Sequence, residues 1–66
     1  MEIRVNGESR QWERPVTVRA LLEELGIPPG MVVVERNLSI VPRDRIDEEM
    51  IEAGDSLEII RLVGGG

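Results

Sequence analysis

The chain has 66 residues, enough for one small domain with a modest core, and its net charge of −5 disfavours nucleic acid and anionic membranes as partners. Cysteine and histidine are absent, which excludes disulfides, thiolate nucleophiles and the usual zinc ligands. We therefore expect neither a self-contained enzyme nor a metal site. No apolar run is long enough to cross a bilayer, and the first residues lack the layout of a secretory signal, so we expect a cytoplasmic protein.

The N-terminal residues predict a β-hairpin. Residues 1–5 alternate apolar and charged side chains, the period of a strand with one buried face. Asn6-Gly7 favours a type I′ turn because both residues tolerate positive φ, so a second strand is expected over residues 8–14. Trp12, the single aromatic residue, is expected to pack inward as part of the core.

A short amphipathic helix is predicted next. Thr17 can cap its first turn. Gly26 favours the left-handed conformation that closes helices, and Pro28-Pro29 prevents continuation, so both ends of the helix are specified locally. The apolar stripe of this helix has the spacing i, i+3, i+4, i+7 and consists of Val18, Leu21, Leu22 and Leu25.

The second half of the chain predicts further strands and a polar loop. Residues 31–34 are apolar on both parities, which suits a strand that is covered on both faces or partly exposed at an interface. Residues 35–37 are expected to turn into a short strand over residues 38–41. Residues 43–53 predict a loop with one helical turn, and Gly54-Asp55 is expected to turn the chain into a last strand.

The polar loop is rich in carboxylates. A calcium loop needs ligands at fixed alternate positions and a glycine at its sharp bend, and that spacing is absent here. We therefore expect a solvated charged face rather than a cation site. The carboxylates are those of Asp44, Asp47, Glu48 and Glu49.

The last strand, over residues 57–62, is expected to have two different faces. Leu57 and Ile59 face the core, whereas Ile60 and Leu62 lie on the opposite parity. If the helix covers only one face of the sheet, Ile60 and Leu62 are exposed and mark a partner surface. The alternative is that the loop of residues 43–53 covers them. Arg61 is expected to lie beyond the edge of the sheet.

Three glycines, Gly64, Gly65 and Gly66, follow this strand. Glycine loses more backbone entropy on ordering than any other residue, so a tail that only completes a fold gains nothing from three of them. Glycines can, however, enter a slot too narrow for a Cβ. Residues 63–66 reach roughly 14 Å when extended, far enough to carry a terminal carboxylate into another protein's buried site. The alternative is a frayed terminus.

The order of the elements predicts an α+β protein with a β-grasp (ubiquitin-like) fold, in which a mixed sheet of four to five strands wraps one helix. The last strand is expected beside the first in the middle of the sheet, and residues 1–66 form a single domain with a flexible tail over residues 63–66. The chain resembles the ubiquitin-like sulfur carriers, most closely the ThiS family of thiamine biosynthesis. The resemblance rests on Asn6-Gly7, Val34 to Asn37, Ile40 to Arg43, Gly54 to Leu57, and Val63 to Gly66.

This resemblance implies a sulfur carrier that acts as a co-substrate. A ThiF-like adenylating enzyme would use ATP and magnesium to activate the carboxylate of Gly66, and a cysteine desulfurase would supply the sulfur of the resulting thiocarboxylate. A ThiG-like thiazole synthase would then take that sulfur. Gly66 is thus the expected covalent site, Gly64 and Gly65 thread the tail, and Ile60, Leu62 and Val63 dock the partner. The chain itself is expected to bind no cofactor.

Two other readings of the sequence stay open. A sulfur carrier for molybdopterin or tRNA thiolation shares the Gly-Gly end, although the molybdopterin subunits are usually longer and carry an aromatic residue and a proline before it. A non-catalytic ubiquitin-like binding module, or a protein modifier joined to lysines, would instead use the face of the sheet.

Overall fold

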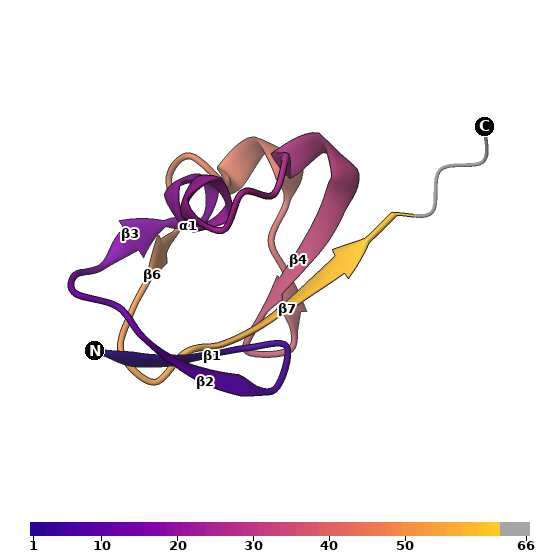
Figure 1. Ribbon diagram of the computed structural model, residues 1–66. Helices are drawn as coiled ribbons and strands as arrows, with labels where there is room; N and C mark the ends of the chain where they lie inside the picture. The colour runs from indigo at the N-terminus through magenta and orange to yellow at the C-terminus, as the bar shows by residue number, and fades with distance from the viewer. Residues whose placement is uncertain (63–66) are drawn as a thin grey trace.

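The computed structural model describes residues 1–62 and contains a five-stranded mixed sheet in the order β2-β1-β7-β4-β5. The last strand is central, parallel to β1 and antiparallel to β4 (Figure 1). This arrangement confirms the predicted mixed sheet and the placement of the last strand beside the first. The strands of the sheet are β1 (Glu2–Val5), β2 (Glu8–Gln11), β4 (Val32–Arg36), β5 (Ser39–Ile40) and β7 (Ser56–Arg61).

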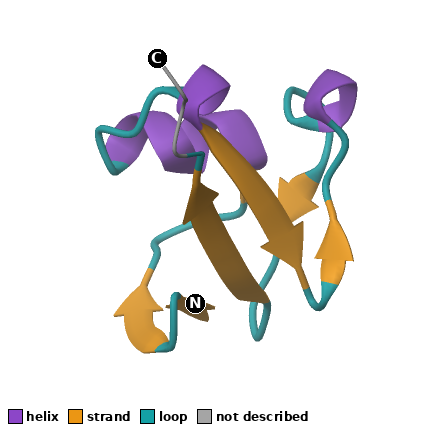
Figure 2. Cartoon of the chain, turned by 90° about the vertical axis from the view of Figure 1, so that its right-hand side faces the viewer, coloured by secondary structure: helices purple, strands orange, loops and turns teal. Residues whose placement is uncertain are grey.

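The helical elements lie toward one end of the two longest strands, β4 and β7, at the top of Figure 2. They are α1 (Val18–Glu24) and the short 3-10 helices η1 (Pro29–Met31) and η2 (Arg43–Arg45). The 3-10 helix η2 confirms the helical turn expected in the polar loop. A second, two-stranded sheet pairs β3 (Val16–Thr17) with β6 (Met50–Ile51), which the sequence did not predict because each of these short strands is defined only by the other.

Helix α1 has the ends that its sequence predicts. The Thr17 hydroxyl accepts a 3.1 Å hydrogen bond from the N–H of Ala20. At the other end Gly26 has φ +75°, and the N–H of Ile27 donates to the carbonyl of Leu22 at 2.8 Å, as in a Schellman motif. The helix is therefore fixed by local chemistry at both ends.

The core lies between α1 and the sheet. Leu21 and Leu22 of the helix are fully buried in one apolar cluster with Ile3 of β1 and Leu57 of the central strand β7. Trp12 is half-buried and packs against this core, as predicted. The remaining buried apolar side chains are those of Val5, Val16, Val18, Val32, Val34, Val41, Ile46 and Ile51.

Two strand predictions were wrong at their ends. Strand β2 stops at Gln11 rather than at residue 14, because the chain leaves the hairpin after Trp12 pairs its N–H with the carbonyl of Met1 at 2.8 Å. At the other end of the sheet Arg61 does not lie beyond the edge: it belongs to β7, opposite Val32, with its side chain exposed.

The turn between β4 and β5 also differs from the expectation that residues 35–37 turn the chain. Strand β4 continues through Arg36, which pairs with Ser39, so the turn falls on Asn37 and Leu38. Both turn residues have positive φ, +51° and +72°. Asparagine tolerates this conformation and leucine does not favour it, so residue propensity gave no signal for a turn at Leu38.

A buried carboxylate ties the turn before β7 to the end of β4. Asp55 is 7% exposed. Its carboxylate accepts hydrogen bonds from Nε of Arg36 at 2.7 Å, from Nδ2 of Asn37 at 3.0 Å and from the N–H of Glu52 at 2.8 Å. The sequence predicted a turn at Gly54-Asp55 but did not predict these partners. Asn37 and Arg36 are 18 and 19 residues away from Asp55 along the chain.

The pKa of Asp55 reports the strength of these contacts. Burial alone raises this pKa, but the hydrogen bonds from Glu52, Asn37 and Arg36 outweigh burial and hold it below its ordinary value. The ionised carboxylate therefore stabilises the fold at all pH values above its unfolded-state pKa of about 3.9, and this contribution is lost as the pH falls through the lower folded-state pKa.

We predict that Asp55→Ala lowers the free energy of unfolding at neutral pH by about 2 kcal/mol, because it removes three hydrogen bonds and leaves Arg36 without its closest partner. Urea denaturation measures this loss. The variant should also lose less stability than the parent when the pH is lowered below about 4, since the linked proton site is gone.

The matched control is Asp44→Ala, which removes an exposed carboxylate and should change stability by less than about 0.5 kcal/mol. Equal stability losses in the two variants would contradict a special role of Asp55.

Candidate functional site

The outward side of β7 carries the apolar residues that the sequence assigned to docking. Ile60 and Leu62 are 45% and 43% exposed, whereas Leu57 is buried and Ile59 half-buried. This confirms the expected division of faces. The alternative, in which the loop of residues 43–53 covers Ile60 and Leu62, is wrong because both side chains stay exposed and the loop is hydrogen-bonded to β3 and to the start of α1 instead.

Neighbouring strands extend this apolar surface. In the register of the sheet Ile60 lies opposite Val33 of β4, and the N–H of Leu62 donates to the carbonyl of Met31 at 2.9 Å. Ile40 of β5 shares the same face and is 65% exposed. We call the side chains of Val33, Ile40, Ile60 and Leu62 the outer patch. Val33 is half-buried and the other three are exposed, and exposed apolar side chains on one face of a sheet are typical of partner surfaces.

Two asparagines hold β7 in place from its two sides. Asn6, with φ +51°, uses its side-chain Oδ1 to accept a 2.7 Å hydrogen bond from the N–H of Ile59. Its backbone N–H donates to the carbonyl of Leu57 at 2.8 Å, so its side chain continues the β1 ladder where β1 itself turns away. Asn37 accepts a 2.9 Å hydrogen bond from the N–H of Ser56 in a similar way. Sequence reasoning found both residues as turn formers and missed these contacts.

The remaining site residues predicted from the sequence, Val63, Gly64, Gly65 and Gly66, lie outside the described residues, so their roles in docking, threading and covalent modification stay predictions. The structure does place the end of β7 on the opposite side of the molecule from Met1 (Figure 1). The outer patch therefore lies beside the segment that leads into residues 63–66.

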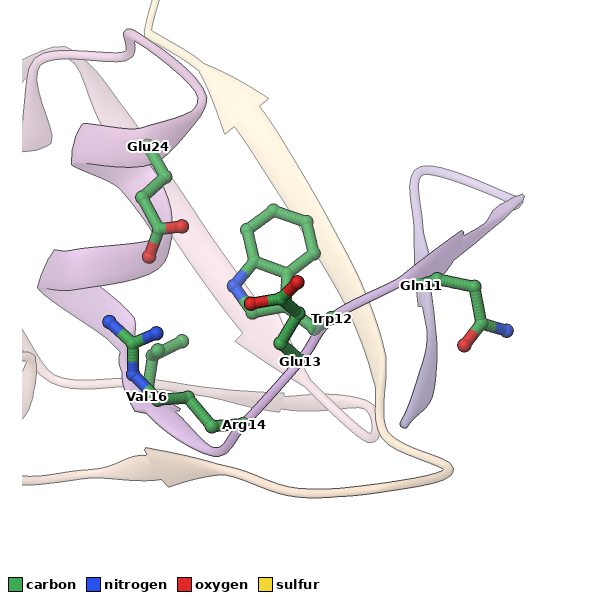
Figure 3. Close-up of a pocket in the computed structure, with 6 residues that line it drawn as sticks. All are labelled: Gln11, Trp12, Glu13, Arg14, Val16 and Glu24. Carbon is green, nitrogen blue, oxygen red and sulfur yellow. The ribbon is translucent and has the colours of Figure 1, made fainter.

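A hollow lies beside Trp12 (Figure 3). Its volume is about 220 Å³. The indole Nε1 is buried and has no hydrogen-bond partner within residues 1–62. The hollow is smaller than the roughly 300–1,000 Å³ typical of ligand sites, and its charged side chains have mixed signs, so we assign it no ligand. Its lining consists of Gln11, Trp12, Glu13, Arg14, Val16 and Glu24.

Three of the four carboxylates of the polar loop form ion pairs with arginines. Asp47 pairs with Arg19, and Glu48 lies 3.3 Å from Nε of Arg45. Glu49 is half-buried and lies 3.4 Å from Nη1 of Arg36. Within the described part of the chain, no three acidic, histidine or cysteine side chains gather closely enough to hold a metal ion. No helix among residues 1–62 is long and apolar enough to span a membrane.

Comparison with known proteins identifies similar chains. Residues 3–66 match the model of the ThiS family. The sulfur carrier protein ThiS of Bacillus subtilis is 32% identical over 97% of this chain and 98% of its own length. Among solved structures, a thiamine biosynthesis protein (ThiS) from Geobacter metallireducens superposes with a TM-score of 0.88 at 29% identity, with both chains covered completely.

A longer relative is also similar over the whole chain. The thiazole synthase of Paramagnetospirillum magneticum is 46% identical over all 66 residues, which correspond to 20% of that protein. The thiazole synthase of Magnetococcus marinus is 36% identical over the same share. The chain thus spans about a fifth of the length of these two relatives.

The contact between Asn6 and β7 can be tested by amide hydrogen exchange. We predict that Asn6→Gly, which keeps the positive φ but removes the acceptor, reduces the protection of the Ile59 amide and lowers stability by about 1 kcal/mol. Asn6→Asp keeps an oxygen acceptor at the same position and should retain the protection of that amide. Equal protection in the two variants would show that the turn alone fixes β7.

Proposed function

Since the chain belongs to the ThiS family, we propose that it carries sulfur for thiazole formation in thiamine biosynthesis. The observation that carries this proposal is the family match, which extends over residues 3–66 and so includes the glycines at the end of the sequence. The structural likeness to the Geobacter metallireducens ThiS protein over the full length supports it.

The chemistry of the proposal takes place at the carboxylate of Gly66. An oxygen of this carboxylate attacks the α-phosphorus of ATP in the site of a separate adenylating enzyme, and pyrophosphate leaves. The acyl adenylate is now electrophilic, because AMP is a good leaving group whereas the oxygen of a carboxylate is not. A sulfur nucleophile supplied by a cysteine desulfurase attacks the carbonyl carbon and displaces AMP. The nucleophile is the outer sulfur of the desulfurase's cysteine persulfide, so the first product is an acyl disulfide. A thiol reductant then cleaves its S–S bond, which leaves the thiocarboxylate on Gly66 and oxidises the thiols to a disulfide.

The chain contributes position rather than catalysis to these steps, so in this proposal it is a co-substrate and not an enzyme. ATP and magnesium belong to the adenylating enzyme. The hydrogen bonds of Asn6 and Asp55 fix β7 relative to the sheet, so the outer patch keeps a constant position relative to the end of β7. In this proposal Ile60, Leu62 and Val63 dock the partner, and Gly64 and Gly65 thread the carboxylate of Gly66 into the partner's site. We place this ATP-dependent chemistry in the cytoplasm.

Thiazole synthase is the proposed recipient of the sulfur. Two relatives named thiazole synthase contain a stretch similar to this whole chain within a protein about five times as long. A carrier-like stretch and a thiazole synthase therefore occur in one polypeptide, which favours thiamine over molybdopterin or tRNA thiolation as the pathway.

The first test is intact-mass spectrometry. Incubation with the adenylating enzyme from the same genome, ATP, magnesium, a desulfurase with cysteine and a thiol reductant should raise the mass by the difference between sulfur and oxygen. Deleting Gly65 and Gly66 should abolish this change and leave the thermal midpoint nearly unchanged, because the deleted residues have no side chains to pack. An unchanged mass of the full chain, with an enzyme active on another carrier, would refute the carrier function.

A second test concerns docking. Ile60→Ser should slow thiocarboxylate formation at least about tenfold, because an exposed apolar side chain at the centre of an interface contributes strongly to binding. Met50→Ser is the matched control, since Met50 is 41% exposed but lies on β6, away from the outer patch. Equal rates in the two variants would remove Ile60 from the docking surface.

A further inference from the structure

The turn between β4 and β5 contains a leucine in an unfavourable place. Leu38 has φ +72° and its side chain is 94% exposed. A bulky side chain disfavours the left-handed region, where the Cβ approaches the backbone, and an exposed leucine gains nothing from burial. The turns at Asn6-Gly7 and Gly54 use residues suited to positive φ. Leu38 therefore lowers the stability of the fold without serving the core.

A hollow of about 440 Å³ lies next to this leucine. Glu35 and Glu58 line it together with Leu38, and the two glutamates are direct cross-strand neighbours on β4 and β7. Like charges in this position destabilise a sheet. Within residues 1–62, neither carboxylate forms an ion pair with an arginine. The repulsion between the two carboxylates therefore lowers the stability of the fold, as the positive φ of Leu38 does.

The two unfavourable features belong to one surface that continues the outer patch. Ile40 lies opposite Glu35 in the register of the sheet, and Glu58 lies two residues before Ile60 on the same strand. The surface therefore consists of the exposed side chain of Leu38, the two carboxylates and the adjoining outer patch. A binding partner complementary to it needs an apolar pocket for the leucine and a basic side chain for the carboxylates.

We propose that a second docking site for thiazole synthase consists of Leu38, Glu35 and Glu58, which we call the Leu38 surface. In this complex Leu38 would insert into an apolar pocket of the synthase, and an arginine or lysine of the synthase would lie between the two carboxylates. This inference rests on the proposed function for the identity of the partner. The relatives in which a similar stretch and a thiazole synthase share one polypeptide point to the synthase as the occupant. The net charge of −5 suits a basic docking surface.

Two substitutions separate docking from folding because they should change binding and stability in different directions. Leu38→Gly removes the Cβ at positive φ, so the thermal midpoint should not fall. Glu58→Arg places opposite charges across the two strands, so the thermal midpoint should rise. Each variant should nevertheless bind the thiazole synthase from the same genome at least about tenfold more weakly than the parent, as measured by calorimetry.

Glu13→Arg is the control for charge. It makes the same change in net charge at an exposed position beside Trp12, on a different part of the surface, and should leave the affinity for the synthase nearly unchanged. Equal weakening by Glu13→Arg and Glu58→Arg would mean that net charge alone matters and would overturn the proposal.

The outcomes for the two proposals differ. Unchanged affinity of Leu38→Gly and Glu58→Arg for the synthase would overturn the second docking site, as would a fall in the thermal midpoint of Leu38→Gly with unchanged affinity. If the two variants form the thiocarboxylate more slowly but bind the synthase normally, the second docking site is also overturned, since the Leu38 surface would then contact the adenylating enzyme. If the parent chain gains sulfur but does not bind the synthase, this inference and the proposed recipient both fail, whereas the carrier function stands. If it does neither, the carrier function fails too.

Discussion

The carboxylate of Asp55 is the contact on which the rest of the structure depends. It joins the turn before β7 to Arg36 and Asn37 at the end of β4, and it does so from a nearly buried position. Burying a carboxylate is unfavourable unless its hydrogen bonds are made, so this group either has all its partners or disrupts the turn. Because β7 is the centre of the sheet, its start fixes its register against both neighbours.

A fixed register gives the two faces of β7 separate roles. Leu57 contributes to the core on one face, and Ile60 lies exposed on the other. The core side chains of α1 pack with the first face, and on the second face Ile40, Ile60 and Leu62 stay exposed and accessible to a partner. A 66-residue chain has little apolar surface to spare, and leaving Ile60 and Leu62 uncovered costs stability that a purely structural domain would retain.

The turn between β4 and β5 and its neighbouring residues also lower the stability of the fold. Leu38 and the neighbouring pair Glu35 and Glu58 would each be replaced in a sequence selected for stability alone, by glycine in the first case and by opposite charges in the second. They lie on the face that carries Ile60, away from the helix. One face of the domain thus stabilises the fold, and the other is less stable than it could be. This separation agrees with a protein that works by presenting itself to partners.

The sequence by itself determined the elements whose signals are local. The ends of α1 follow from Thr17 and Gly26, and the alternation along β7 predicted which side chains are buried. Tertiary structure alone decided the contacts of Asn6 and Asp55 and the position of the turn at Leu38. Those contacts depend on partners that are distant in the chain: the side chain of Asn6, for example, accepts a hydrogen bond from Ile59, 53 residues away. Residue propensity describes only local preferences and cannot identify such a partner.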